Sequence, residues 1–75
     1  MKEMIEVIAK ALVTNPDAVT VTETVTERET VLTLHVDPAD MGKVIGKQGR
    51  IAKAIRTVLK AKAIRDDVRV SLDIE

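Results

Sequence analysis

The chain has 75 residues, with 12 basic and 12 acidic side chains, one histidine, no cysteine and no Phe, Tyr or Trp. This length predicts a single small domain over residues 1–75, and the missing cysteines exclude disulfides, thiolate catalysis and cysteine-based metal sites. No apolar run approaches the ~20 residues that cross a bilayer. Glu3 and Glu6 interrupt the first segment, which argues against a signal peptide. We therefore expect a cytoplasmic protein without membrane association.

The neutral net charge hides an uneven distribution along the chain. Residues 1–40 carry three basic and eight acidic side chains, net −5. Residues 41–65 carry eight basic and no acidic ones, net +8, and residues 66–75 are net −3. A polyanion would be attracted to the middle segment and repelled elsewhere, which restricts where it can dock.

The first expected element is an amphipathic helix over residues 2–13. Its apolar side chains fall in an arc roughly 200° wide, opposite a charged side. Asn15-Pro16 ends the helix, because proline disfavours helical geometry in the residue before it. The arc suits core packing, but its width could also serve a partner surface.

Two strands follow, over residues 18–26 and 29–36, with the expected turn of a hairpin at residues 26–29. Glu23 interrupts the apolar face of the first strand, which is typical of an edge strand. The alternating apolar side chains are Val19, Val21 and Val25 in the first strand and Leu32, Leu34 and Val36 in the second.

Asp37-Pro38 predicts the start of a second helix, with Asp37 as N-cap and Pro38 in the first turn. This short helix runs to about Ile45. Residues 46–49 interrupt it, and a third helix continues from about Arg50 to Ile64. The expected core stripe of that helix is Ile51, Ile55, Val58 and Leu59, and another side carries Lys53, Arg56 and Lys60.

After a turn at Asp66-Asp67, residues 68–75 alternate as a final strand. The expected order is α-β-β-α-(GxxG)-α-β. The hairpin and the last strand form a three-stranded sheet, and the helices cover its apolar face. This is a two-layer α+β domain.

The most informative motif is the Gly46-Lys47-Gln48-Gly49 loop between two helical segments. Glycine lets a backbone approach a bulky anion, because no Cβ intervenes. A helix N-terminus adds outward N–H groups and the positive end of the dipole. Lys47 and Arg50 supply full charges at the same point. A plain helix connection is the alternative, but the acid-free surroundings favour a phosphate-backbone clamp.

The block Val-Ile-Gly-Lys-Gln-Gly-Arg-Ile, residues 44–51, is similar to the signature of KH domains, whose GxxG loop grips single-stranded nucleic acid. The element order resembles the type II KH arrangement. The Asn15–Val19 turn, the longer block from Met41 to Arg56 and the short length resemble the KhpA family of small bacterial KH proteins. That resemblance covers nearly the whole chain.

The resemblance implies a non-catalytic RNA-binding protein without a cofactor, a proposed RNA chaperone and post-transcriptional regulator linked to cell-envelope growth and cell shape. It also implies a homodimer and pairing with a larger KH-containing protein, KhpB. The partner molecule is single-stranded RNA. The expected RNA-binding residues are Lys43, Ile45, Gly46, Lys47, Gln48, Gly49, Arg50, Ile51, Lys53 and Arg56.

Without aromatic side chains, the chain lacks the stacking platforms of RRM and OB modules. An aliphatic groove from Ile45, Ile51 and a strand such as residues 31–36 would have to hold the bases. Each missing aromatic stack is worth ~1–3 kcal/mol. We therefore expect modest affinity, relaxed sequence preference and strong salt dependence, with dimerisation raising avidity.

Other interpretations of these residues are less specific. The stripe of Lys53, Arg56 and Lys60 could be a solvated helix face, although no nearby acid offsets its repulsion. His35, the single histidine, has no metal-ligand set around it in the sequence and is expected to face away from Leu34. Asp37 and Asp40 are spaced as paired carboxylates, but capping explains that spacing.

Two alternative functions remain. A protein-interaction module, for homo- or heterodimers with RNA binding secondary, would use the wide apolar arc of the first helix together with Val13 and Ile64. An enzyme acting on a phosphorylated small molecule would use GKQG as its anion cradle. No nucleophile, base and metal set accompanies that cradle, and the domain is small for a deep pocket.

Overall fold

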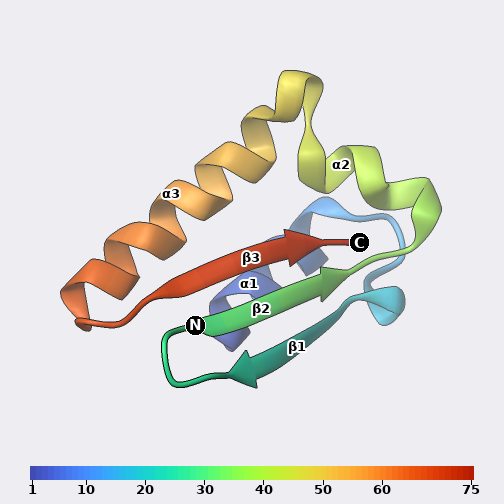
Figure 1. Cartoon of the computed structure of the whole chain (residues 1–75). Coiled ribbons are helices and arrows are strands. Elements are labelled where there is room, and N and C mark those ends of the chain that lie inside the picture. Colours follow the sequence, from blue (N-terminus) through green and yellow to red (C-terminus); the bar gives the residue numbers. More distant parts are fainter.

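Three helices and three strands alternate along the chain in the computed structural model, which describes residues 1–75 (Figure 1). One-turn 3₁₀ helices sit at three of the connections. The helices are α1 (Lys2–Leu12), α2 (Met41–Ile45) and α3 (Arg50–Arg65), and the strands are β1 (Thr20–Val25), β2 (Thr30–His35) and β3 (Val70–Ile74). The 3₁₀ turns span Pro16–Ala18, Pro38–Asp40 and Lys47–Gly49.

The sheet has the order β1-β2-β3, so β2 is central and the other two strands are edges. β1 pairs with β2 antiparallel across the hairpin, with Val21 opposite Leu34. β3 pairs with β2 in parallel, with Leu32 opposite Leu72. A parallel pair needs a crossover connection, and α2, the loop and α3 provide it. The predicted α+β order and the edge position of β1 are confirmed.

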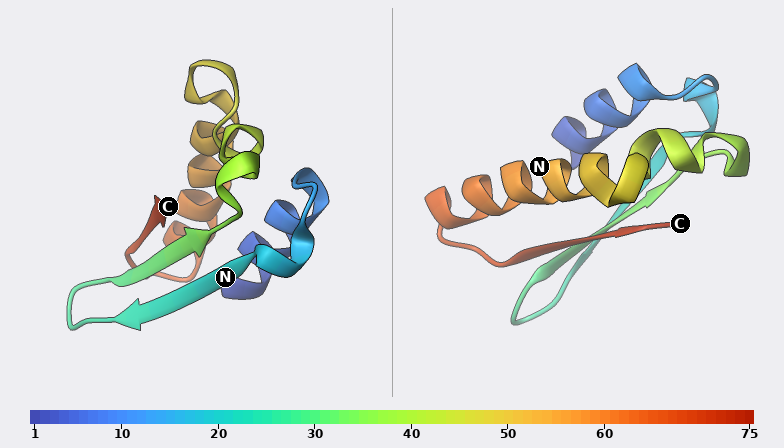
Figure 2. Two further views of the ribbon diagram at one scale, coloured as in Figure 1. Left: turned by 90° about the vertical axis from the view of Figure 1, so that its right-hand side faces the viewer. Right: turned by 90° about the horizontal axis from the view of Figure 1, so that it is seen from above.

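All three helices lie on one face of the sheet and leave the other face bare (Figure 2). The core forms between these two layers. It consists of buried side chains from α1, α2, α3 and all three strands, together with Val19 and Val36: Ile5, Ala9, Val19, Val21, Leu32, Leu34, Val36, Val44, Ile55, Leu59 and Leu72. The alternation of the strand sequences thus places every second side chain against the helices.

Local signals in the sequence fix the turns. The side chain of Asp37 accepts a hydrogen bond from the N–H of Ala39 at 3.0 Å, as expected of an N-cap. In the hairpin turn, the Thr26 hydroxyl accepts from the N–H of Glu29 at 3.0 Å and donates to its carbonyl at 2.9 Å. Asp67 adopts a left-handed conformation, φ 56°, between α3 and β3. The predicted element boundaries are confirmed to within about two residues, except that the second helix begins as the 3₁₀ turn Pro38–Asp40 and becomes α-helical at Met41.

Two residues that were expected on apolar faces are exposed. Val58 is 51% exposed, whereas the buried stripe of α3 is Ala52, Ile55, Leu59 and Ala63. Val58 therefore lies on the outward side of α3. Val25, expected on the apolar face of β1, is 70% exposed because it lies beyond the reach of the helices at the hairpin end.

Candidate nucleic-acid interface

The loop between α2 and α3 has a conformation that depends on its glycines. Gly46 has φ 77° and ψ 171°, and Gly49 has φ 73°. Gln48 is also left-handed, at φ 58°. The N–H of Gly46 donates to the carbonyl of Gly42 at 2.9 Å, and the N–H of Gly49 donates to that of Gly46 at 3.1 Å. The chain therefore turns sharply, and α2 and α3 form a V with the loop at its apex (Figure 1).

Gly46 is required by packing as well as by its φ angle. A Cβ on this residue would lie 2.6 Å from Cγ1 of Ile51. A Cβ on Gly49 would meet nothing within 4 Å. The first glycine of the loop thus lets the backbone rest on the first turn of α3, and the second leaves open space beside the chain, where another molecule's backbone could approach.

Positive charge gathers at the apex of the V. Lys47, Gln48 and Arg50 are exposed, and Nη2 of Arg50 lies 3.4 Å from Oε1 of Gln48. The first turn of α3 contains no acidic residue to offset the positive end of its dipole. Full charges and partial charges of the same sign therefore coincide at the loop, which is the electrostatic requirement for holding an anion.

Ile45 and Ile51 flank the loop and are partly buried. Both pack against the hydrophobic core with part of their surface still open. Each anchors one arm of the V, and together they supply an aliphatic surface directly beside the cationic apex.

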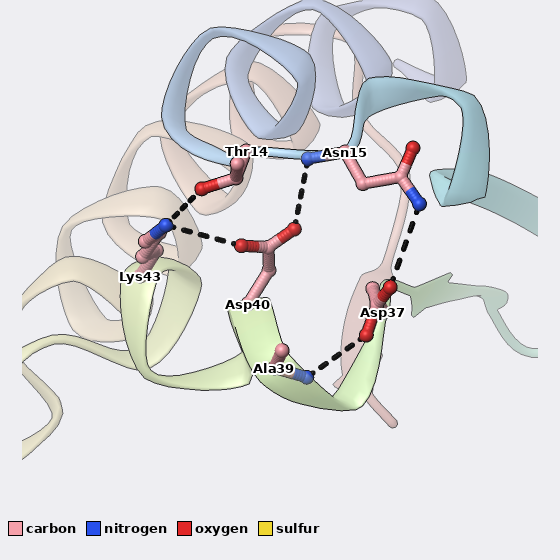
Figure 3. Close-up of polar contacts among 6 residues, drawn as sticks. All are labelled: Thr14, Asn15, Asp37, Ala39, Asp40 and Lys43. Carbon is pink, nitrogen blue, oxygen red and sulfur yellow. Dashed lines mark hydrogen bonds and ion pairs between the residues drawn. The ribbon is translucent and has the colours of Figure 1, made fainter.

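Lys43 lies in α2, just before the loop, and its charge is already paired. Its Nζ is 3.2 Å from Oδ1 of Asp40 and donates a hydrogen bond to the hydroxyl of Thr14 (Figure 3). Asp40 is 2% exposed, and its carboxylate also accepts from the N–H of Asn15 at 3.0 Å. This clasp of Thr14, Asn15, Asp40 and Lys43 holds α2 against the turn that follows α1.

The clasp changes the titration of Asp40. The N–H of Asn15 is the main reason that the pKa of the Asp40 carboxyl lies below its usual range. Burial opposes this shift, and Thr14 and Lys43 add to it. Asp40 is thus a buried anion with hydrogen bonds that favour its charged form. The prediction that capping explains Asp37 and Asp40 holds for Asp37, whose carboxylate also accepts from Nδ2 of Asn15 at 3.4 Å (Figure 3). Asp40 instead joins two segments 25 residues apart.

Lys53, Arg56 and Lys60 continue the positive surface along one side of α3, and all three are exposed. Arg56 has a second role. Its Nε and Nη2 donate to the carbonyl of Leu72 at 3.3 and 3.2 Å. Leu72 belongs to β3, whose outer edge has no neighbouring strand. Arg56 therefore bridges the helix and the open edge of the sheet.

A groove of about 510 Å³ lies between α3 and β3 on the side of this bridge. Its floor is largely apolar, and the charged residues on its walls are three cations and one acid. The lining residues are Glu29, Arg56, Leu59, Lys60, Ala63, Ile64, Val68, Arg69, Val70, Ser71 and Leu72.

One expectation from the sequence, that a strand such as residues 31–36 forms the wall of the groove, needs correction. The strand beside α3 is β3, not residues 31–36, because β2 is the central strand and both of its edges are paired. The preference of strand–helix–strand units for right-handed parallel crossovers is the signal that could have indicated β3. His35 is exposed at the end of β2, as expected, and no group of three or more His, Cys, Asp or Glu residues is arranged to hold a metal ion.

Comparison with known proteins identifies the family of this domain. The family model described as "KhpA/KhpB, KH domain" matches residues 2–74. The chain belongs to this family.

Curated members of the family align over nearly the full chain. The proteins named RNA-binding protein KhpA from Clostridium perfringens and Aquifex aeolicus are 58% and 53% identical over 74 residues, covering 99% of this chain and 99% and 94% of the respective relatives. That from Treponema pallidum is 49% identical over 73 residues, covering 97% of this chain and 91% of the relative. No solved structure matches the chain significantly. None of its helices is both long and apolar enough to cross a membrane.

Proposed function

We propose that this chain is a non-catalytic RNA-binding protein that grips single-stranded RNA at the GKQG loop and along α3. The observation that carries the proposal is the acid-free segment of residues 41–65, net +8, whose loop is displayed at the apex of the V formed by α2 and α3. The names of the family's curated members support the choice of RNA.

In this proposal the phosphates follow the cationic side of the V. Lys47, Arg50, Lys53 and Arg56 contact the backbone, and the open space at Gly49 lets it come close. Single strands are held in this way by a basic surface that tracks the phosphates, while the bases turn toward a separate wall. Ile45, Ile51 and the apolar floor of the groove between α3 and β3 form that wall. Lys43 acts chiefly through the clasp, because its charge is paired with Asp40.

The same binding activity would make the chain an RNA chaperone or post-transcriptional regulator acting in the cytoplasm, with the effects on cell-envelope growth and cell shape that the family resemblance implies. A surface that lacks aromatic stacking holds RNA modestly. Modest, exchangeable binding suits a protein that helps strands to pair and rearrange.

The decisive test is fluorescence anisotropy of a labelled single-stranded RNA with the wild type and the Lys47→Asp/Gln48→Asp variant. Aspartate tolerates the left-handed conformation of residue 48, so we expect the variant to fold with an unchanged circular dichroism spectrum. We expect salt-sensitive binding by the wild type and a loss of more than tenfold in the variant. Equal affinities of the two folded proteins would exclude the loop as the RNA site.

A second candidate function, protein pairing, has its own observation. Val7, Ile64 and Val25 are 68%, 70% and 70% exposed, although they are large and apolar. Val7 lies on α1 but away from its buried residues, Ile5 and Ala9. We propose that the chain also forms a homodimer, and a heterodimer with a larger KhpB-like KH protein, which would raise avidity for RNA. Sedimentation of the full chain across a wide concentration range tests the homodimer, and a strict monomer would refute it.

A further inference from the structure

A single acidic residue, Glu29, lines the groove between α3 and β3. Glu29 comes from the β1–β2 hairpin. The cations on the same walls are Arg56, Lys60 and Arg69. A carboxylate repels phosphate, so a bound strand would keep its backbone on the α3 wall and present a base, not a phosphate, to Glu29.

The backbone of Glu29 is held in place by the hairpin itself. Its carbonyl accepts from the N–H of Thr26 at 2.8 Å and from the Thr26 hydroxyl at 2.9 Å, and its N–H donates to that hydroxyl at 3.0 Å. The hairpin is joined to the start of β3 by the hydrogen bond from the N–H of Thr30 to the carbonyl of Arg69, at 2.8 Å. The stem of the Glu29 side chain therefore leaves from a defined point at the end of the groove.

The Glu29 carboxylate has capacity left to accept hydrogen bonds. The three ion pairs of the chain join Met1 to Glu3, Asp40 to Lys43 and Lys62 to Asp66, so none of them engages Glu29. No side-chain hydrogen bond ends on its carboxylate oxygens either, since its bonds to Thr26 use backbone atoms. Glu29 is exposed and lines the groove together with Lys60 and Arg69, which are hydrogen-bond donors, and the two oxygens of its carboxylate are therefore free to accept from a ligand.

We propose that Glu29 makes this end of the groove a subsite for an unpaired guanine; the inference rests on the RNA-binding function proposed above. The Watson–Crick edge of guanine carries two adjacent donors, N1–H and the N2 amino group, which match the two oxygens of one carboxylate. The O6 atom beside them is an acceptor for Lys60 or Arg69.

The other bases fit this arrangement less well. Adenine and cytosine each place an acceptor ring nitrogen beside the amino group, which a carboxylate repels. Uracil has one N–H between two carbonyl groups. Proteins read unpaired bases by such hydrogen bonds to the Watson–Crick edge. A single guanine preference is therefore the expected departure from an otherwise relaxed sequence preference.

The test uses labelled oligouridine RNAs in which one position in turn carries guanosine, inosine, adenosine or cytidine, and measures binding by anisotropy. Inosine lacks only the N2 amino group of guanosine. For the wild type we expect at least about fivefold tighter binding with guanosine than with uridine at one position, since a good bidentate pair discriminates by ~1–3 kcal/mol. Inosine should lose most of that gain.

The variant is Glu29→Gln, and its matched control is Glu27→Gln, which removes the same charge from the same turn but does not line this groove. We expect Glu29→Gln to abolish the guanosine preference and Glu27→Gln to keep it. An equal effect of both variants, uniformly tighter binding of all RNAs by Glu29→Gln, or a wild type without guanosine preference would overturn the inference while leaving the RNA-binding function intact. A wild type that binds none of these RNAs would overturn both.

Discussion

Gly46 rests against Ile51 so closely that only a hydrogen fits between the loop backbone and the first turn of α3. A Cβ at residue 46 would lie 2.6 Å from Cγ1 of Ile51, in a residue whose φ is 77°. Because Ile51 also packs against the core, this contact connects the loop to the core. The first glycine of the loop is therefore held by packing against α3, although the loop lies at the periphery of the domain.

Gly46→Ala should destabilise the domain by about 2 kcal/mol or more, because overpacking and a strained φ each cost ~1–3 kcal/mol. Urea unfolding measures this. Gly42→Ala is the control: a Cβ there meets nothing within 4 Å, and alanine in a helix is favoured over glycine by ~0.5–1 kcal/mol. A Gly46→Ala variant as stable as the wild type would contradict the close contact.

Asp40 should make stability depend on pH in the acid range. The pKa of its carboxyl is lowered from 3.8 in the folded state, so the unfolded chain binds more protons there and stability rises with pH. This contribution is fully present above about pH 5 and is lost as the pH falls through the lowered folded-state pKa. In Asp40→Asn, that part of the acid dependence should disappear.

Thermal unfolding of the wild type and Asp40→Asn between about pH 2 and 7 checks this prediction. Asp37→Asn serves as the comparison, since Asp37 caps its helix at the surface and shows no comparable burial. Parallel pH profiles for the wild type and Asp40→Asn would show that the clasp does not depend on the charge of Asp40.

Substitutions of Arg56 and Lys53 should differ in their effect on stability, although both should weaken RNA binding. Arg56→Gln removes two N–H groups from the carbonyl of Leu72 and should cost about 1 kcal/mol of unfolding free energy. Lys53→Gln has no such bond to lose and should change stability by less than ~0.5 kcal/mol.

Both variants should bind RNA more weakly. Each lost phosphate contact lowers the slope of log affinity against log salt by ~0.7 for a single strand. Anisotropy titrations at several salt concentrations give this slope. If the salt slope of Lys53→Gln equalled that of the wild type, Lys53 would not contact a phosphate of the bound RNA.

Val58 and Leu59 are neighbours in sequence, but substitutions at the two positions should change the unfolding free energy by very different amounts. Leu59 is 2% exposed, so Leu59→Ala should cost ~2–5 kcal/mol. Val58 is 51% exposed, and Val58→Gln should change the unfolding free energy by less than ~0.5 kcal/mol. Denaturant titrations at two protein concentrations check both. If the loss of unfolding free energy in Val58→Gln increased with protein concentration, Val58 would lie in a subunit interface.

Much of this domain could be predicted from the sequence because its signals are local. The period of the apolar residues indicates α1, the hairpin and the last strand, and Asp37-Pro38 marks the helix start that the cap confirms. The two glycines around Lys47 and Gln48 mark the loop, because φ angles of 77° and 73° are open to glycine without strain. The positive segment follows from the order of charged residues along the chain and depends on no contact between distant segments.

Features that depend on contacts between distant segments were decided only by the tertiary structure. It joins Lys43 to Thr14, 29 residues away, and to Asp40, so a lysine that is predicted to bind RNA also takes part in the clasp. It sets β3 beside α3 and brings Glu29 to their groove. It also buries Ala52 and Ala63 of α3 and leaves Val58 exposed. Periodicity fixes which side chains share a helix face, but only the packed partner fixes the direction in which that face turns.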